Sequence, residues 1–225
     1  MLNTYKLTQL KSKTSLFKNY MYIISDKKTK NAAIIDPAWE GEDIYDVLDA
    51  LGVKLTTILL THSHYDHVNM VNPILEKYSP QVYMSQREIE FYNFRCDNLH
   101  PLQDMQNLKL GDTEILCLLT PGHTAGGMCF LLSDHIITGD TVFIEGCGIC
   151  NADGGSAEDM FNSFQKLRNM VPLDVRVCPG HSYGKEPGLT FKEVLKYNLY
   201  FQISKKEHFV QFRMRKYQTG LFEFK

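Results

Sequence analysis

Residues 62–67 read HSHYDH, so three histidines and an aspartate fall within six positions. No other stretch of the chain holds so many histidines so close together. The stretch follows an apolar, β-branched run that predicts a buried strand. Because residues two apart in extended backbone point to the same side, His62 and His64 can face one point. Asp66 and His67 lie where the chain turns and can face a second point nearby. We therefore expect a metal site at the carboxyl end of this strand.

Three further candidate ligands share one local pattern, since each lies at the end of an apolar run in or beside a glycine turn. They are His123, Asp140 and His181. Glycine lets the backbone turn sharply and approach closely, so strand ends at one edge can bring these side chains together. Imidazole and carboxylate ligands suit zinc, and also iron or manganese.

These seven candidate ligands exceed what one tetrahedral ion needs, so we expect two zinc ions. The ligands expected at site 1 are His62, His64, His123 and Asp140, and those at site 2 are Asp66, His67, Asp140 and His181. Asp140 would bridge the two ions, and a water between them would ionise near neutral pH. The expected catalytic residues are Asp140 and Asp66, which would orient the resulting hydroxide.

Runs of alternating or helical character give the expected elements. Strands are expected at 20–24, 32–35, 55–60, 81–84, 114–119, 128–132, 135–138 and 175–178, and helices at 42–51, 66–78 with an interruption at Pro73, 85–94, 156–170 and 193–210. Residues 96–107 are expected to be irregular. This order favours an α/β (α+β) fold of the αββα type, in which two mixed sheets pack together and helices flank them. We expect a single domain over 1–225 with a short C-terminal helical extension at about 190–225.

Composition narrows the function. The net charge is -2, which gives no strong field for nucleic acid or an anionic membrane. The chain has no apolar run long enough to span a membrane and begins without a hydrophobic signal region, so we expect a cytoplasmic protein. The six cysteines lie mostly in apolar runs and suit reduced thiols. The pair Cys147 and Cys150 has CxxC spacing, for which a redox or zinc-knuckle role is an alternative.

The residues at 62–67, followed by His123, Asp140 and His181, resemble the five motif elements of the metallo-β-lactamase superfamily in their order. The resemblance covers roughly residues 15–185. It implies the αββα fold and a zinc hydrolase.

Within that superfamily the chain is similar to glyoxalase II-like thioesterases, because residues 139–143 (GDTVF) are followed by Gly-Cys-Gly at 146–148. In glyoxalase II a cationic residue and a tyrosine after this motif bind glutathione, whereas this chain has Ile149 and Asn151. Ile149 cannot pair with a carboxylate. The resemblance implies substrate contacts at Phe143, Ile149 and Asn151.

The whole chain resembles the small zinc hydrolases encoded with trans-acyltransferase polyketide synthases, such as those of bacillaene clusters. That resemblance implies a thioesterase that removes stalled acyl groups from the phosphopantetheine arm of an acyl carrier protein, by attack of a metal-bridging hydroxide on the thioester. Carrier proteins are acidic, and the basic residues within 205–216 are a possible docking surface. The alternatives are a hydroxyacylglutathione hydrolase and, more remotely, an iron-containing redox protein on the same scaffold.

Overall fold

The structure is a computed structural model that describes residues 3–12, 18–39 and 41–215. Two mixed β-sheets form its centre. The first has the strand order β1 (Tyr5–Lys11), β2 (Tyr20–Asp26), β3 (Asn31–Ile35), β4 (Lys54–Leu59), β5 (Gln81–Ser85) and β6 (Leu99–Leu102). The second has the order β11 (Arg176–Pro179), β10 (His135–Gly139), β9 (Met128–Leu131), β8 (Thr113–Leu119) and β7 (Asn107–Leu110).

Strand direction explains why ligands collect at one edge. In the first sheet, β1, β2 and β3 are antiparallel, whereas β3, β4, β5 and β6 run parallel. In the second sheet, β10 and β11 are parallel and the other pairs are antiparallel. The parallel strands β4, β10 and β11 are each followed directly by candidate ligands.

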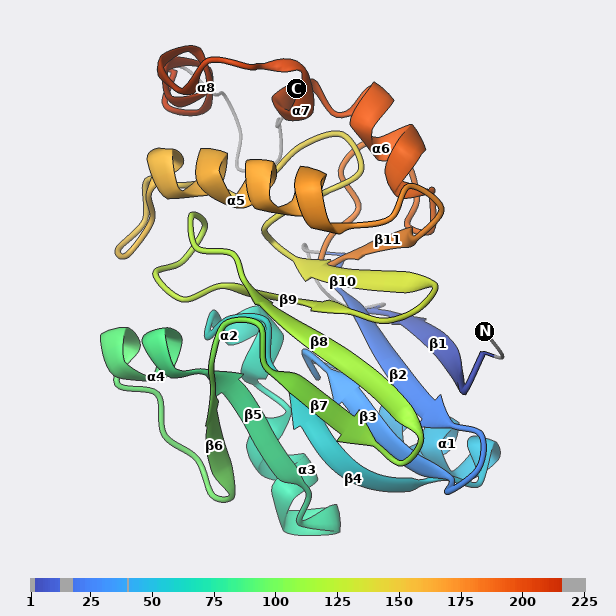
Figure 1. Cartoon of the computed structure of the whole chain (residues 1–225). Coiled ribbons are helices and arrows are strands. Elements are labelled where there is room, and N and C mark those ends of the chain that lie inside the picture. Colours follow the sequence, from blue (N-terminus) through green and yellow to red (C-terminus); the bar gives the residue numbers. More distant parts are fainter. Residues whose placement is uncertain (1–2, 13–17, 40, 216–225) are drawn as a thin grey trace.

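Helices cover the outer faces of both sheets, so the molecule has four layers (Figure 1). The helices are α1 (Gly41–Leu51), α2 (Tyr65–Val68), α3 (Val71–Tyr78), α4 (Gln86–Tyr92), α5 (Ala157–Met170), α6 (Phe191–Tyr197), α7 (Leu199–Gln202) and α8 (Lys206–Arg213). Apolar residues of α1 and α3 pack on the outer face of the first sheet. Those of α5, α6, α7 and α8 pack on the second sheet. The αββα expectation is therefore confirmed.

A third apolar cluster fills the space between the sheets. Ile24 and Ile35 of the first sheet meet Phe130 and Ile137 of the second there, and all four are fully or almost fully buried. Strand β2 is buried along its whole length. This dry interlayer holds the ends of β4 and β10 in fixed positions, which the site above them requires.

The observed elements differ from the expected ones in several places. Strands β1 and β7 were not expected, and β6 falls within the stretch expected to be irregular. Both β6 and β7 are four-residue edge strands, too short to show alternation, and β6 contains Pro101, which an edge strand tolerates. The expected helix at 66–78 is two helices, α2 and α3. Pro73 does not break it but lies in the first turn of α3, where its missing N–H costs no hydrogen bond.

The expected helix at 193–210 is divided into α6, α7 and α8. Asn198 causes the first break, because its side-chain oxygen accepts a hydrogen bond from the backbone N–H of Tyr200 and caps α7. Its side-chain nitrogen donates to the carbonyls of Phe143 and Gly146. The break therefore fastens the C-terminal helices to the loop that follows Asp140.

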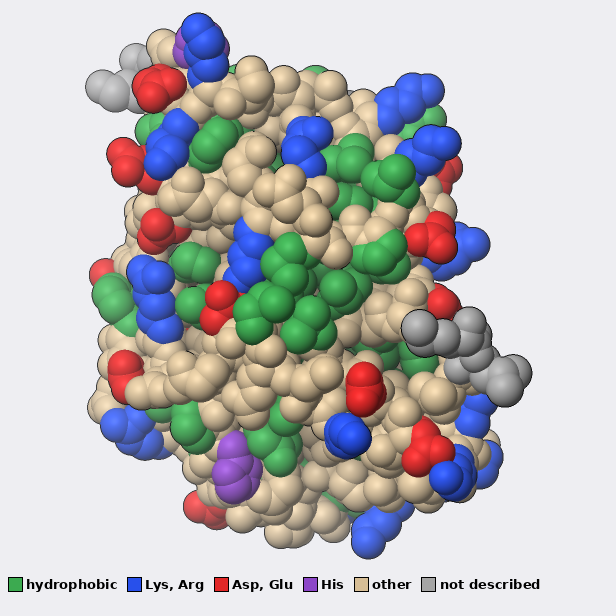
Figure 2. Space-filling view, viewed as in Figure 1, with side chains coloured by type: hydrophobic (Ala, Val, Ile, Leu, Met, Phe, Trp, Pro, Cys, Tyr) green, Lys and Arg blue, Asp and Glu red, His purple; other side chains and the backbone are tan. Residues whose placement is uncertain are grey.

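On the face drawn in Figure 2, basic and acidic side chains are interspersed around a central group of hydrophobic side chains. This face carries no field of one sign, in keeping with the small net charge. Among the described residues, no helix is long and apolar enough to cross a membrane.

Candidate metal centre

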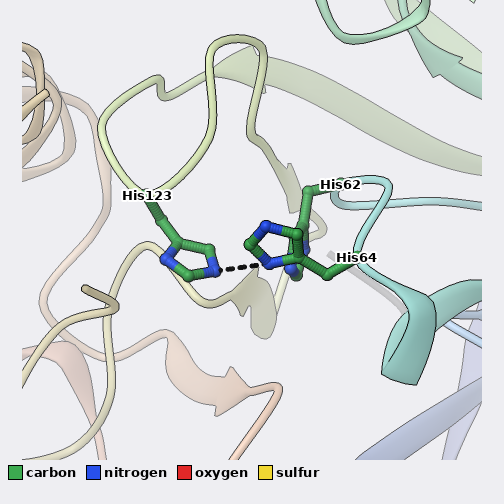
Figure 3. A group of neighbouring side chains, drawn as sticks. All are labelled: His62, His64 and His123. Atoms are coloured by element: carbon green, nitrogen blue, oxygen red, sulfur yellow. Dashed lines mark hydrogen bonds between the residues drawn. The ribbon is translucent and has the colours of Figure 1, made fainter. Parts of the chain in front are cut away.

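Three histidines from two loops converge beyond the carboxyl end of β4. His62 and His64 follow that strand, and His123 lies between β8 and β9 (Figure 3). His123 Nε2 lies 2.9 Å from His64 Nδ1, and one ring nitrogen of each of the three residues lies within 4.8 Å of the others. We call His62, His64 and His123 the first triad.

A second group lies beside the first. Asp66 and His67 belong to the short helix α2, and His181 follows β11. Asp66 Oδ2 lies 3.6 Å from His67 Nε2 and 3.3 Å from His181 Nε2, and the two Nε2 atoms are 3.2 Å apart. We call Asp66, His67 and His181 the second triad.

Asp140, at the end of β10, lies between the triads. Its Oδ2 is 3.6 Å from His123 Nε2 and 3.4 Å from His181 Nε2, and its Oδ1 is 3.5 Å from His67 Nε2. Gly180 lies against the Asp140 side chain and makes this approach possible, because a Cβ at Gly180 would lie 2.6 Å from Asp140 Oδ1. The structure thus brings together all seven residues that the sequence nominated as ligands.

The outer ring nitrogens of four histidines are hydrogen-bonded away from the centre. The acceptors of the Nδ1 atoms are Thr61 Oγ1 for His62 (3.0 Å), Asp36 Oδ2 for His67 (3.0 Å), the Ile149 carbonyl for His123 (2.7 Å) and the Lys18 carbonyl for His181 (3.3 Å). With its single proton on Nδ1, a neutral ring in this position turns the lone pair of Nε2 inward, as metal-binding histidines do.

The donor set fits a divalent cation such as zinc. His62 Nε2 and Asp140 Oδ1 are buried and have no hydrogen-bond partner among the described residues. Such orphaned atoms are costly unless a ligand satisfies them. Inward lone pairs on neighbouring imidazoles would also repel one another without a cation between them. Nitrogen and carboxylate oxygen are the ligands expected for zinc.

The two triads differ in their protonation. Burial lowers the pKa of each histidine in the first triad, that of His123 to about 4. Burial alone would lower the pKa of His181 too, but the charges of Asp140 and Asp66 raise it to about 10. His67 has a raised pKa for the same kind of reason. Burial would raise the pKa of Asp66, yet His181 and His67 lower it, so Asp66 is anionic at neutral pH.

Two buried acids that the sequence analysis did not assign to the site support it from outside. Asp36 accepts hydrogen bonds from His67 Nδ1 and from the backbone N–H and hydroxyl of Thr61. Its position at the end of an apolar strand was the signal that could have found it. The second buried acid is Glu88, which lies three residues after Ser85, the N-cap of α4. Ser85 Oγ accepts from the Glu88 backbone, but the Glu88 carboxylate points elsewhere.

Both Glu88 oxygens face the first triad's loops. Glu88 is fully buried, and its Oε1 accepts hydrogen bonds from the backbone N–H and hydroxyl of Ser63, each at 2.8 Å. Its Oε2 accepts from the Gly126 N–H at 2.8 Å. Ser63 separates two ligands of the first triad, so Glu88 ties that segment to the loop that carries His123.

The expected substrate contacts lie at different depths. Phe143 is buried, with its ring 6.0 Å from that of His181 and 4.6 Å from that of Tyr183, a residue the sequence analysis did not single out. Ile149 is half-buried and contacts His123 through its carbonyl. Asn151 is exposed. The other three histidines, His100, His135 and His208, belong to no potential metal-binding group among the described residues.

Most aromatic residues of the C-terminal helices are packing residues, although Tyr197 is exposed. Tyr200, Phe201 and Phe209 are buried in the layer that covers the second sheet. Cys147 and Cys150 are both buried, unpaired thiols. Neither group contributes to the metal centre.

A sequence profile of the family described as "Metallo-beta-lactamase superfamily" matches residues 15–181. The chain belongs to the metallo-β-lactamase superfamily, and it is a metallohydrolase. The resemblance inferred from the motif order is therefore confirmed.

Individual relatives indicate which members of the superfamily the chain is similar to. The chain is 56% identical to the "Probable polyketide biosynthesis zinc-dependent hydrolase BaeB" of Bacillus velezensis over 99% of both chains. It is 33% identical to a "Hydroxyacylglutathione hydrolase" of Serratia proteamaculans over 73% of this chain and 62% of the relative. Among solved structures, ETHE1 from Myxococcus xanthus is similar with a TM-score of 0.85 and 25% identity, over 97% of this chain and 94% of that one.

Proposed function

We propose that this protein is a two-zinc thioesterase of polyketide antibiotic synthesis, which releases stalled acyl groups from the phosphopantetheine arm of an acyl carrier protein. The observation that carries the hydrolase chemistry is the pair of triads joined by Asp140, whose Oδ2 lies within 3.6 Å of a ligand from each. The similarity to a relative named as a polyketide biosynthesis hydrolase, over 99% of both chains, supports the pathway.

When bound, zinc would polarise the thioester carbonyl and let water ionise at neutral pH. The chain's own groups would direct that water. Asp66, anionic at neutral pH, can accept its hydrogen bond and orient it towards the carbonyl carbon. Asp140 is held anionic by His181 and His67, although burial alone would raise its pKa. The leaving thiolate needs no dedicated general acid, because thiols ionise with a pKa of about 8.5.

The surroundings of the site support an acyl-pantetheine substrate over glutathione. The half-buried ring of Tyr183, which packs on buried Phe143, lies beside His181 and offers an apolar surface there. Ile149 provides no cation for a glutathione carboxylate. Not all of the basic residues expected to dock the carrier lie at the surface. Arg213 is buried and donates a hydrogen bond to the Tyr200 hydroxyl. Lys216 lies outside the described residues.

The test is direct. Zinc-loaded protein is incubated with an acyl carrier protein bearing a short acyl chain and, separately, with S-lactoylglutathione, and both reactions are followed by mass spectrometry. We expect the carrier to lose the mass of its acyl group, leaving the free thiol. Absence of that release, together with fast turnover of the glutathione thioester, would contradict the proposal. Iron in place of zinc on elemental analysis, with no hydrolysis of either substrate, would favour a redox protein.

A further inference from the structure

A chain of hydrogen bonds leads from the surface to the second triad through Asn19, the residue before β2. Trp39 Nε1 donates to Asn19 Oδ1 at 3.0 Å. Asn19 Nδ2 then donates to the Asp66 backbone carbonyl at 2.7 Å and to Asp66 Oδ2 at 3.1 Å. Asn19 is almost completely buried, with 1% of its surface exposed.

The tryptophan determines which way the asparagine amide faces. An indole N–H can only donate, so it fixes the amide oxygen on its own side. The two amide hydrogens must then point at Asp66, where one meets the backbone and the other the carboxylate. The bonded Oδ2 is also the oxygen that faces His67 and His181. Asn19 therefore defines the rotation of the Asp66 side chain towards the second triad.

Trp39 is itself held in a costly conformation. Its φ is 64°, a left-handed value that is unusual for a bulky residue. Its backbone N–H donates to Asn69 Oδ1 at 2.8 Å, and its ring lies edge-on to Tyr65, 5.9 Å between centroids. Strain of this kind persists where the surroundings fix it and is common at functional sites. Here the strained backbone of Trp39 places its indole N–H within hydrogen-bond distance of Asn19 Oδ1.

The same segment also contacts the third member of the triad. The carbonyl of Lys18 accepts the hydrogen bond of His181 Nδ1, and Asn19 pairs with His181 in an antiparallel bridge. Two consecutive residues thus contact two ligands that come from distant parts of the chain.

We propose that Asn19 is a positioning residue for the metal centre: it holds the Asp66 carboxylate in its ligating orientation, and Trp39 holds Asn19. This inference rests on the proposed two-zinc centre. In it, Trp39 affects zinc binding only by orienting Asn19.

The test measures zinc affinity, not turnover. Each zinc dissociation constant is obtained by competition with a chromophoric chelator for the wild type, Asn19→Ala, Trp39→Phe and the double variant. We expect Asn19→Ala to weaken the second-triad zinc about tenfold or more, the usual effect of losing an outer partner, and to leave the first-triad zinc unchanged. Trp39→Phe should weaken the same zinc by less, and it should add nothing in the Asn19→Ala background.

The chain's only tryptophan gives an independent readout. In the wild type, the emission of Trp39 should change as the second-triad zinc binds, and in Asn19→Ala this response should be lost. Tyr65→Phe is the matched control, since it keeps the ring beside Trp39 and removes only a hydroxyl. Its zinc affinities should equal those of the wild type.

The outcomes are distinct. Equal zinc affinities of wild type and Asn19→Ala would overturn the role of Asn19, and additive effects of the two substitutions would overturn the role of Trp39. A wild-type stoichiometry of one zinc would instead overturn the two-zinc centre. If circular dichroism shows that Asn19→Ala does not fold, Trp39→Phe decides the matter: an unchanged affinity for the second-triad zinc overturns the proposal.

Discussion

The two triads differ in what surrounds them, although they lie side by side. The first consists of histidines whose pKa values are lowered by burial, so its rings are neutral at neutral pH. The second contains a carboxylate, and the pKa values of its histidines are raised by nearby acids. The first triad is thus ready for a cation without losing protons, whereas the second must exchange protons for it.

The residues that hold each triad in place also differ. In the first triad, Glu88 from α4 accepts hydrogen bonds from the backbone of the ligand loops, and the Ile149 carbonyl accepts one from His123 Nδ1. The second is held by Asp36, Asn19 and the Lys18 carbonyl at the ends of β2 and β3. A defect in either support should therefore affect one ion more than the other, and the substitutions below test this separation.

Asp140→Ala should have the largest effect, because Asp140 lies between the two triads and approaches histidines of both. We expect loss of zinc from both positions and a fall in turnover of at least about a hundredfold, since the variant removes a bridge and leaves its partners unsatisfied. Elemental analysis after gel filtration, together with the carrier-protein assay, measures both. Wild-type zinc content or activity in this variant would show that Asp140 does not bridge.

Glu88→Gln should act mainly on the first triad. An amide in place of the carboxylate directs an NH2 group at the N–H donor of either Ser63 or Gly126. A hydrogen bond is then replaced by a repulsion between two donors. We expect the first-triad zinc to bind about tenfold more weakly, with the second-triad zinc little changed, the reverse of Asn19→Ala.

Ser63→Ala is the matched control for that substitution. It removes only one of the three hydrogen bonds to Glu88 and should produce a smaller loss of the same zinc. An equal loss of both zinc ions in Glu88→Gln would break the separation of the two supports.

Ile149→Lys should have the smallest effect and should change substrate preference. A cation at this half-buried position could pair with a glutathione carboxylate, and a solvent-exposed pair of this kind contributes up to about 1 kcal/mol, roughly a fivefold gain. We expect a gain of that order in kcat/KM for S-lactoylglutathione. Ile149→Met, of similar length and without charge, should give none, and a gain in both variants would refute the charge explanation.

The convergence of the candidate ligands was predictable from the sequence because most of them lie just after a strand, and strand ends meet at one edge of an αββα sandwich. Glu88 and Asn19 were not, since each acts through a contact between segments far apart in the chain: Glu88 with Gly126, and Asn19 with Asp66. The missed strands β6 and β7 are short edges whose pairing depends on their neighbours. Asn198, which divides the C-terminal helix, acts through the carbonyls of Phe143 and Gly146.

The most direct test of the two unequal triads is a count of bound zinc by native mass spectrometry as the pH is lowered from 8 to 6. Below its pKa of about 10, His181 is protonated in the metal-free protein, so protons compete increasingly with zinc as the pH falls. The affinity of the second triad should drop about tenfold per pH unit for each proton displaced. The first triad, with His123 at a pKa of about 4, should be nearly unaffected. We predict two zinc ions at pH 8 and one at pH 6 in folded protein; one zinc at every pH, or parallel loss of both, would contradict the account.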